Sequence, residues 1–587
     1  MSDWKSALGK IADELRRSEH ASSKVSPSVA KSGVHQSPDR RSVEVAVVTK
    51  PAASPTPPVK APIQVLKVAA KGADRQPTPQ AVRAPFPPGR SGFAKRSVTP
   101  TRTIPQSSAL HRLRVPPAPQ RRGAKAPAPP ARVSYPEPNM KNYTIGYPDC
   151  DGSADQEWQT LGTGSGVGQM QPGRRSLCTV GLDFGTAFTK ACVQVRNSTY
   201  VVHWDGCVKS APSSSFLLPS IFSELSDGTC SLGVFAGAKQ HSDIKMALLG
   251  KPAANDNLAA TVFIALATRY IRAWLFTDHR DVVDGFRLDW SLNVGLPSSS
   301  WDDPVTCGLY KQLALAGWRL GSSPGPVTFA AAQTMLSVEK AEQPMPGQID
   351  AEMVATFPEF GAQVHSYRSS AQRQRDLHLL VDIGAGTVDI VTFHIGGGED
   401  SEINCILEPI VKKSGTHILL GYRAQTGLLT NSTWDDSVAA FNQAEFESAF
   451  GLKTGLLRGV QDHFAEMLHL SIRRVLHLTK ENRYETSPAW SEGVPFFLSG
   501  GGRRVDAYRE AIRRSRMDRR LIELSLPTPE DVVLGKMNAG QFHRLSVAHG
   551  LSFTAENLTK TLRRSDVSDL RRVSELTEDY HDRYIEK

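Results

Sequence analysis

Two stretches of the chain repeat one pattern of apolar and polar positions. In TVGLDFGTAFTKACVQV (179–195) an apolar run ends at Asp183, a tight turn follows, and a second apolar run returns. About 200 residues later, LHLLVDIGAGTVDIVTFHI (377–395) repeats the arrangement, with Asp382 near the end of its first run. Short apolar runs bounded by glycine-containing turns are typical of strands. The pattern therefore predicts two β-hairpins, each with an aspartate at its mouth.

A third element follows the second hairpin. VPFFLSGGGRRVDAYREAI (494–512) is an apolar run, then three glycines, then a helical pattern with its apolar residues on one side. Glycine lets a ligand approach the backbone closely, and a helix cap does not need three in a row. Gly500, Gly501 and Gly502 are therefore candidates for contact with a nucleoside.

Residues 1–20 have the spacing of a short amphipathic helix. Trp4, Leu8, Ile11 and Leu15 recur on one helical face, and arginines stand near the end. Two interpretations stay open: the helix docks in a groove of a protein partner, or it packs back on the chain's own body.

Residues 21–175 differ from the rest of the chain in composition. Roughly 22 of the 39 prolines fall between residues 21 and 140, and residues 1–140 hold 24 Lys and Arg against 8 Asp and Glu. A Pro-rich segment poor in aromatics buries too little apolar surface to offset its ordering entropy, so we expect a disordered basic linker. Its charge suits nucleic acid or another acidic surface, or it only keeps the linker soluble. GTGSGVGQM, from Gly162, lacks the ending of a Walker loop and is interpreted as the linker's flexible end.

Cysteine usage and hydropathy bear on the compartment. The seven cysteines are scattered and include no C-x-x-C, which favours a reduced, cytoplasmic location over a disulfide framework or zinc site. No run of about 18 apolar residues occurs, so we expect no transmembrane span. No apolar stretch follows the N-terminal charges, so we expect no signal peptide.

The two hairpin turns combine groups that suit a phosphate. Their glycines permit positive φ and let backbone N–H groups approach an anion: Gly185, Gly384 and Gly386. Thr186 and Thr387 each add a hydroxyl. A carboxylate beside an anion repels it unless a cation lies between them, and Mg²⁺ with bound waters is the natural cation at a phosphate site. Asp183 and Asp382 are therefore candidates to hold Mg²⁺ through water.

These three elements, in this order, resemble the phosphate-1, phosphate-2 and adenosine motifs of the actin/Hsp70/sugar-kinase superfamily, and most of all those of the Hsp70 nucleotide-binding domain. LLPSIF (from Leu217), DIKMALLG (from Asp243), ATFPEFGAQVHSY (from Ala355) and RLSVAHGLSF (from Arg544) are similar to further segments of that domain. The resemblance covers residues 176–553. It implies an α/β, two-lobed actin-like ATPase fold of duplicated ribonuclease-H-like domains, with ATP or ADP between the lobes.

The resemblance also implies roles for single residues. Asp183 and Asp382 would order the hydrated Mg²⁺, Glu359 would position the attacking water, and Lys245 would lie near the γ-phosphate. Asp389 would be a further carboxylate of the cleft. The remaining implied residues would contact nucleotide: Gly185, Thr186, Gly384, Ala385, Gly386, Thr387, Gly500, Gly501, Gly502 and Arg504.

Departures from the family limit what the resemblance implies. Ala385 stands where Hsp70 has a glycine, and the residues after the matched region, 554–587, have the pattern of a charged helical extension rather than a peptide-binding domain. We therefore expect a slow ATPase acting as a conformational switch that engages a protein partner. The alternative is an actin-like protein that forms filaments with ATP, with its N-terminal region as an anchor. A small-molecule kinase is a third reading, but no convincing catalytic aspartate is found for it.

Overall fold

The computed structural model describes ten segments of the chain: 135–140, 143–146, 157–164, 174–208, 214–249, 252–337, 349–396, 403–429, 433–558 and 561–564. The chain divides into two units at Arg121, and all described residues belong to the second unit. The predicted helix over 1–20, most of the linker, and residues 565–587 of the C-terminal extension lie outside the described residues. Those predictions stay predictions.

The first hairpin forms the middle of one mixed sheet. Strands β2 (Arg175–Asp183), β3 (Phe188–Val195) and β4 (Ser198–Val201) are antiparallel neighbours. Strands β9 (Arg287–Leu296) and β10 (Val354–Pro358) then add in parallel beside β2, which gives the order β10-β9-β2-β3-β4, extended by β17 (Val532–Val533). The apolar run ending at Asp183 is thus a central strand, which explains why its residues are buried.

The second hairpin forms the middle of a second sheet with the same path. Strands β11 (Asp376–Ile383), β12 (Val388–Gly396) and β13 (Ile403–Lys412) are antiparallel, and β15 (Val494–Ser499) and β16 (Leu521–Leu524) add in parallel beside β11. The order is β16-β15-β11-β12-β13, extended by β18 (Thr561–Leu562). Three antiparallel strands followed by two parallel ones therefore occur twice. This duplication confirms the predicted α/β, actin-like fold class.

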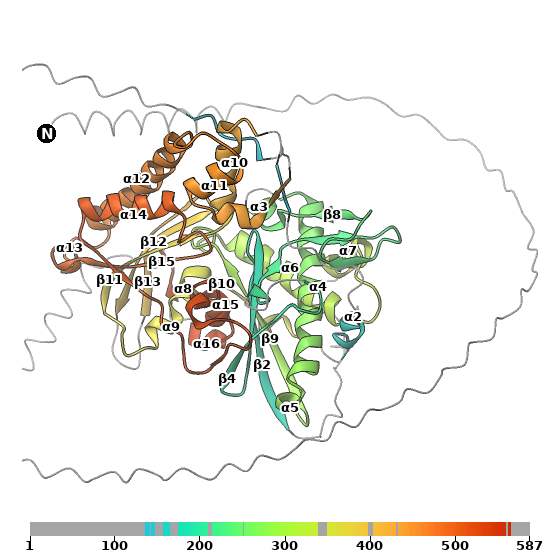
Figure 1. Ribbon diagram of the computed structural model, residues 1–587. Coiled ribbons are helices and arrows are strands. Elements are labelled where there is room, and N and C mark those ends of the chain that lie inside the picture. The colour runs from blue at the N-terminus through green and yellow to red at the C-terminus, as the bar shows by residue number, and fades with distance from the viewer. Residues whose placement is uncertain are drawn as a thin grey trace, which may run out of the picture. The chain divides into compact units, whose positions relative to one another are not determined.

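Helices cover each sheet and separate the two halves in Figure 1. The first half carries α2 (Trp158–Leu161), α3 (Ile244–Leu248), α4 (Ala254–Asp278), α5 (Arg280–Val283), α6 (Pro304–Ser322) and α7 (Phe329–Ser337). The second half carries α10 (Thr416–Thr426), α11 (Gln443–Ala449), α12 (Arg458–Asn482), α13 (Ala489–Glu492) and α14 (Asp506–Asp518). Between them lie α8 (Glu359–Gln363), α9 (His365–Arg368), α15 (Ser546–Leu551) and α16 (Ala555–Leu558). Helix α15 packs on both β2 and α8.

Smaller elements complete the fold. Strands β6 (Phe222–Glu224), β7 (Cys230–Leu232) and β8 (Lys239–His241) form a three-stranded sheet, and β5 (Leu218–Pro219) pairs with β3. Strand β1 (Thr144–Gly146) runs parallel to β14 (Thr433–Asp435).

Helix α4 is the one described helix that is long and apolar enough to cross a membrane by length and composition. Its most apolar window is 89% buried inside the protein. Seventeen consecutive residues, Ala260–Phe276, are buried, and most of their apolar side chains belong to the core of the first half. Burial on all sides explains why α4 lacks a polar face.

The predicted linker, 21–175, extends too far at its C-terminal end. Trp158 is buried, with its ring edge against Tyr270, and the Arg272 guanidinium donates to the carbonyl oxygens of Gly162 and Gly164. The backbone N–H of Gly164 donates to Ser322 O at 2.8 Å. The start of GTGSGVGQM is therefore part of the fold, because its carbonyl groups satisfy a buried cation.

The predicted C-terminal extension also begins inside the fold. Leu558 is buried, β18 pairs with β13, and Arg564 lies 3.0 Å from the carboxylate of Glu408. Residues 555–558 are helical as predicted, but residues 561–562 form a strand, because the edge of β13 offers unpaired backbone groups.

We predict that Trp158→Ala lowers the free energy of unfolding by about 3–5 kcal/mol, because it removes a buried indole and leaves a cavity beside Tyr270. Urea unfolding followed by circular dichroism measures this loss. Val305→Ala, at a position that is 79% exposed, is the control and should change stability by less than about 0.5 kcal/mol. Equal stability of the two variants would show that residues 157–164 do not pack as described.

Candidate functional site

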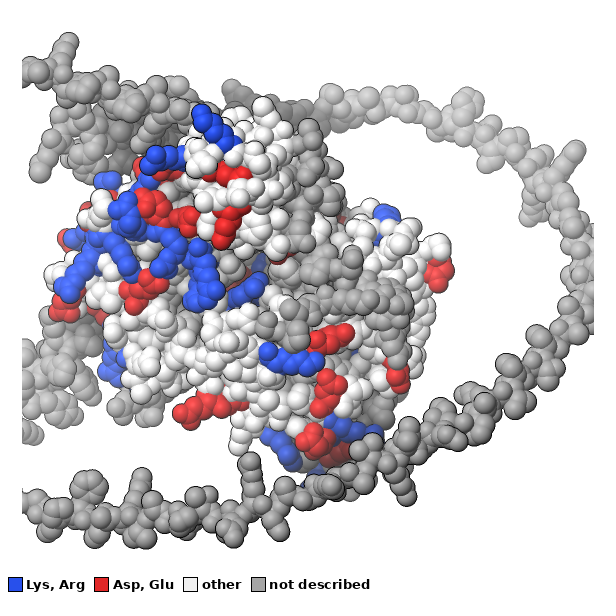
Figure 2. Space-filling model, viewed as in Figure 1, with Lys and Arg blue, Asp and Glu red and all other residues white. Residues whose placement is uncertain are grey.

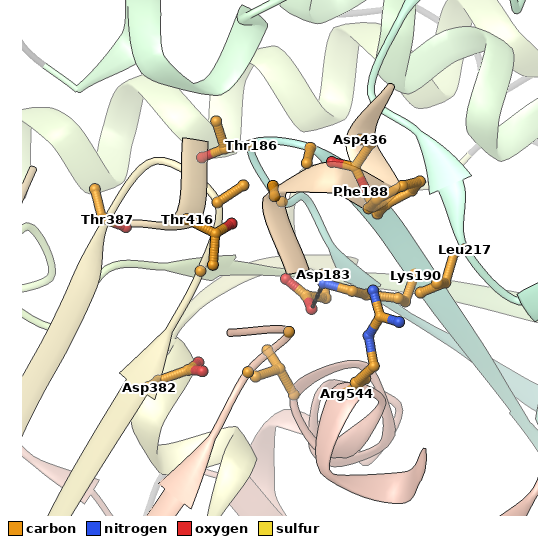
Figure 3. Close-up of a pocket in the computed structure, with 18 of the residues that line it drawn as sticks. Asp183, Thr186, Phe188, Lys190, Leu217, Asp382, Thr387, Thr416, Asp436 and Arg544 are labelled. Atoms are coloured by element: carbon orange, nitrogen blue, oxygen red, sulfur yellow. Dashed lines mark hydrogen bonds and ion pairs between the residues drawn. The ribbon is translucent and has the colours of Figure 1, made fainter. Parts of the chain in front are cut away.

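One cavity of about 390 Å³ is lined from both halves of the protein. Figure 3 shows Asp183 and Lys190 of the first sheet facing the same space as Asp382 and Thr387 of the second. Most of the predicted site residues line it: Asp183, Gly185, Thr186, Lys245, Glu359, Asp382, Gly384, Ala385, Thr387, Asp389, Gly500 and Gly501. The structure therefore brings together residues separated by more than 300 positions in the chain.

The hairpin glycines are required by close packing rather than by positive φ. Gly185, Gly384 and Gly386 are not among the residues with positive φ, contrary to the expectation from the sequence. A Cβ at Gly185 would overlap Phe188 O, and one at Gly386 would lie 2.7 Å from Met246 Sδ and 3.1 Å from a carbon of Thr186. The last distance shows that the two turns touch each other.

At the first position of the triple glycine, both a positive φ and close packing require glycine. Gly500 has φ +82°, and a Cβ there would overlap Asp382 Oδ1 and Ile383 O. Gly502 donates its N–H to Ile383 O at 3.0 Å. This loop therefore lies directly against the end of β11, where side chains larger than glycine would displace Asp382.

Two lysines pair with cavity carboxylates. Lys190 Nζ lies 2.8 Å from Asp183 Oδ2, across the β2–β3 hairpin, and Lys245 Nζ lies 2.5 Å from Glu359 Oε1. Burial by itself lowers the pKa of Lys245, but the charges of Glu359 and Asp183 outweigh it, so its pKa lies above the ordinary value. Lys245 is thus a cation under the conditions of any neutral-pH reaction.

Two aspartates face each other across the second hairpin, because Asp382 and Asp389 are register partners of β11 and β12. Burial, with the charges of Glu359 and Asp183, raises the pKa of Asp382 to about 6. Burial, with the charges of Glu359 and Asp382, raises the pKa of Asp389 well above its ordinary range. A cation bound near these two carboxyls would lower their pKa values again and so favour their ionised form.

The donor set fits a hydrated Mg²⁺. Asp382 Oδ1 and Asp389 Oδ1 are buried without a hydrogen-bond partner, while Gln363 Nε2 donates to Asp382 Oδ2 at 3.1 Å. Within the described residues, no group of three or more His, Cys, Asp or Glu side chains is placed to hold a metal directly. Unpartnered carboxylate oxygens without a full protein cage suit Mg²⁺, which keeps several of its waters.

Several residues that line the cavity were not predicted from the sequence. Lys190 follows Asp183 by seven positions, and its place opposite Asp183 in the predicted hairpin was a usable signal. Gln363 and Thr416 come from α8 and α10, and Arg544 is the last residue of a short 3-10 helix (Ala539–Arg544) before α15. Nothing in their local sequence points to a ligand. Only the packing of distant elements brings these three to the cavity.

Three predicted residues do not line the cavity: Gly386, Gly502 and Arg504. The two glycines support the turns by close packing, as described above. Arg504 is exposed at the start of α14, and the arginine that lines the cavity is Arg544, with its guanidinium 6.0 Å from the centre of the Phe188 ring. Burial lowers the pKa of Arg544, which still stays a cation because arginine begins so high.

Neither a family model nor a curated protein matches the sequence. Solved structures do match: MreB5 of Spiroplasma citri bound to AMPPNP has 13% identity and a TM-score of 0.39, over 66% of this chain and 98% of that chain. The same protein bound to ADP gives 13% identity and 0.37 over the same shares, and apo pSK41 ParM gives 13% and 0.33 over 64% and 97%. The fold assignment rests on the sheet topology above. The likeness to Hsp70 in particular stays a prediction.

We predict that Asp382→Asn changes how stability depends on pH in the absence of metal and nucleotide. A carboxyl whose pKa rises from 3.8 to about 6 on folding contributes stability below about pH 4, and this is lost as the pH rises through 6. The asparagine variant escapes the loss, so its stability relative to wild type should increase by about 3 kcal/mol between pH 4 and pH 7. Urea midpoints at both pH values measure it, and a relative decrease would contradict this charge arrangement.

Proposed function

We propose that the protein binds ATP in the cavity between its two sheets and slowly hydrolyses it to ADP and phosphate. The observation that carries the proposal is the pairing of two similar hairpin turns, each with an aspartate and a threonine, around one cavity. Its volume of about 390 Å³ lies within the range of ligand pockets, about 300–1,000 Å³. Both turns offer hydroxyls and backbone N–H groups to a phosphate chain.

The lysines and carboxylates would exchange partners when nucleotide binds. Without nucleotide, Lys190 and Lys245 compensate Asp183 and Glu359, as their distances of 2.8 and 2.5 Å indicate. A polyphosphate would draw the two ammonium groups toward its oxygens. Asp183, released by Lys190, and Asp382 would then hold hydrated Mg²⁺ through its waters, with Asp389 as a further carboxylate of the cavity. When bound, Mg²⁺ neutralises charge on the β- and γ-phosphates.

We assign to Glu359 the orientation of the attacking water. It begins α8, and without nucleotide Lys245 pairs with its carboxylate. Phosphoryl transfer to water depends mostly on positioning and charge stabilisation, so a carboxylate beside the water and a cation beside the phosphate are the two parts required. Glu359 Oε1 would accept the hydrogen bond of the water, and Lys245 would stabilise charge on the transferred group.

We predict that the wild-type protein releases phosphate slowly from ATP with Mg²⁺, and that Asp382→Asn abolishes this turnover. Glu359→Gln should keep ATP binding but lower kcat by roughly 100- to 10,000-fold, because the water loses its acceptor. Glu481→Gln, at an exposed position of α12, is the matched control and should behave as wild type. Phosphate release measures turnover, and calorimetry measures ATP binding.

Two results would count against this proposal. Tight ATP binding without turnover in the wild-type protein would make the nucleotide a structural or regulatory ligand and end the ATPase proposal. Unchanged turnover in both site variants would place the chemistry outside this cavity.

The same nucleotide cycle fits either of two alternative functions. In the first, the halves open and close with nucleotide as an Hsp70-like switch, and the helix predicted over 1–20 engages a protein partner in the cytoplasm. In the second, the protein is actin-like and polymerises with ATP, with its N-terminal region as an anchor. The three similar solved structures named above are of MreB5 and ParM, not of an Hsp70.

We predict that sedimentation separates the two functions. If the protein polymerises, ATP or a non-hydrolysable analogue with Mg²⁺ moves it to the pellet at micromolar concentration, and ADP or Asp382→Asn leaves it in the supernatant. A protein that stays in the supernatant with every nucleotide, while turnover continues, acts as a switch instead.

A further inference from the structure

Helix α14 and its flanks form the most concentrated run of arginines in the sequence. Residues 503–520, RRVDAYREAIRRSRMDRR, contain eight arginines, no lysine and three acidic residues. Figure 2 shows blue side chains gathered over α14 and the neighbouring α12. The proposed ATPase cycle makes no use of this surface, since only the glycine loop before it lines the cavity.

The packing of α14 turns its arginines outward. Its apolar side, which includes Ala507, Tyr508, Ala511 and Ile512, is buried in the core of the second half. Arg509, Arg513 and Arg516 are spaced at i, i+4 and i+7, so they share one face of the helix. Their side chains are 52, 63 and 42% exposed, and exposed Arg520 follows just beyond the helix end. We name Arg509, Arg513, Arg516 and Arg520 the α14 arginine row.

Acidic neighbours compensate only part of this charge. Glu510 is shared by Arg513 and Arg514, at 2.6 and 2.9 Å, and Glu523 is shared by Arg509 and Arg516, at 3.3 and 2.7 Å. Arg514 also pairs with Asp462 and Glu466, at 2.8 and 3.3 Å, so the charge around Glu510 is compensated. One carboxylate between two guanidinium groups leaves a net positive charge at Arg509 and Arg516, which share Glu523. In the described part of the chain, no acidic side chain lies within ion-pair distance of Arg520.

The ion pairs of α14 lie at the surface. The side chains of Glu510 and Glu523 are 32 and 34% exposed. Exposed ion pairs of this kind contribute little to stability, about 0–1 kcal/mol each, so a competing anion can displace them at small cost. The arginine row is thus available to an external ligand without unfolding α14.

We propose that the α14 arginine row binds the phosphate backbone of nucleic acid, without sequence preference. The planar guanidinium donates two parallel hydrogen bonds to a phosphate, which lysine does not, and this run contains arginine alone. Arg509 and Arg516 are seven residues apart, about 10 Å along the helix. A duplex carries one negative charge per about 1.7 Å of its axis, so a row of this length spans several phosphates.

Two other occupants fit less well. A membrane surface is bound by helices that expose an apolar face, and the apolar face of α14 is buried, with Met517 its one large apolar residue that is exposed. The chain's own N-terminal region holds 24 Lys and Arg against 8 Asp and Glu in residues 1–140, so it has the same sign as the row and is repelled. Charge complementarity therefore favours an external polyanion.

The test uses the full-length protein and a fluorescent duplex DNA of about 30 base pairs and mixed sequence. Fluorescence anisotropy gives the affinity from about 50 to about 200 mM salt. The test variant is Arg509→Gln/Arg513→Gln/Arg520→Gln. The matched control removes three charges from the N-terminal region: Arg112→Gln/Arg114→Gln/Arg121→Gln. Circular dichroism and ATP binding confirm that each variant is folded.

We expect the row variant to bind DNA at least roughly tenfold more weakly and to lower the slope of log affinity against log salt by about three. Arg520→Gln alone, which breaks no ion pair of the helix, should lower the slope by about one and covers the case in which the triple variant fails to fold. An unchanged slope in these variants overturns the proposal. So does an equal loss in the control, since binding would then follow net charge, and so does binding to anionic vesicles in place of DNA.

Discussion

The gathering of four carboxylates, buried or half-buried, in one cavity is the constraint on which the rest of this structure depends. Asp183, Glu359, Asp382 and Asp389 line the same space, and carboxylates taken out of water need a counter-charge or a proton. Lys190 and Lys245 supply the counter-charge to Asp183 and Glu359. Burial raises the pKa values of Asp382 and Asp389, which favours their protonated form. A cation is the ligand that relieves such a site.

The duplicated sheets satisfy this constraint with one geometry used twice. In each half the aspartate stands at the end of the first strand of the hairpin, and that strand is central in its sheet. The carboxylate is therefore held by a buried strand, while the threonine of the turn beside it lines the cavity. The distance of 3.1 Å between a Cβ at Gly386 and a carbon of Thr186 shows how closely the two turns meet, and a larger residue at Gly386 would also displace the side chain of Met246.

Strand β15, the glycine loop and helix α14 run from the cavity to the surface. β15 runs beside β11, its glycine loop packs against Asp382, and α14 then exposes its arginines on the second half. The loop and the helix thus present opposite chemistry within about 20 residues. Buried glycines leave room for a ligand against the backbone, whereas the exposed arginines present positive charge to solvent. Both arrangements suit phosphate, one inside the cavity and one on the surface.

The sequence by itself determined the two hairpins, the glycine loop and most of the cavity, because strand periodicity and turn glycines are local signals that the repeat doubles. Only the tertiary structure decided that Arg544 and Gln363 reach the cavity, since each arrives from a distant element. It also decided that the turn glycines serve close packing, and that Trp158 belongs to the core although its surroundings read as linker. Composition describes a segment as a whole, whereas burial is decided by the one side chain that finds a partner, here Tyr270, more than 100 residues away.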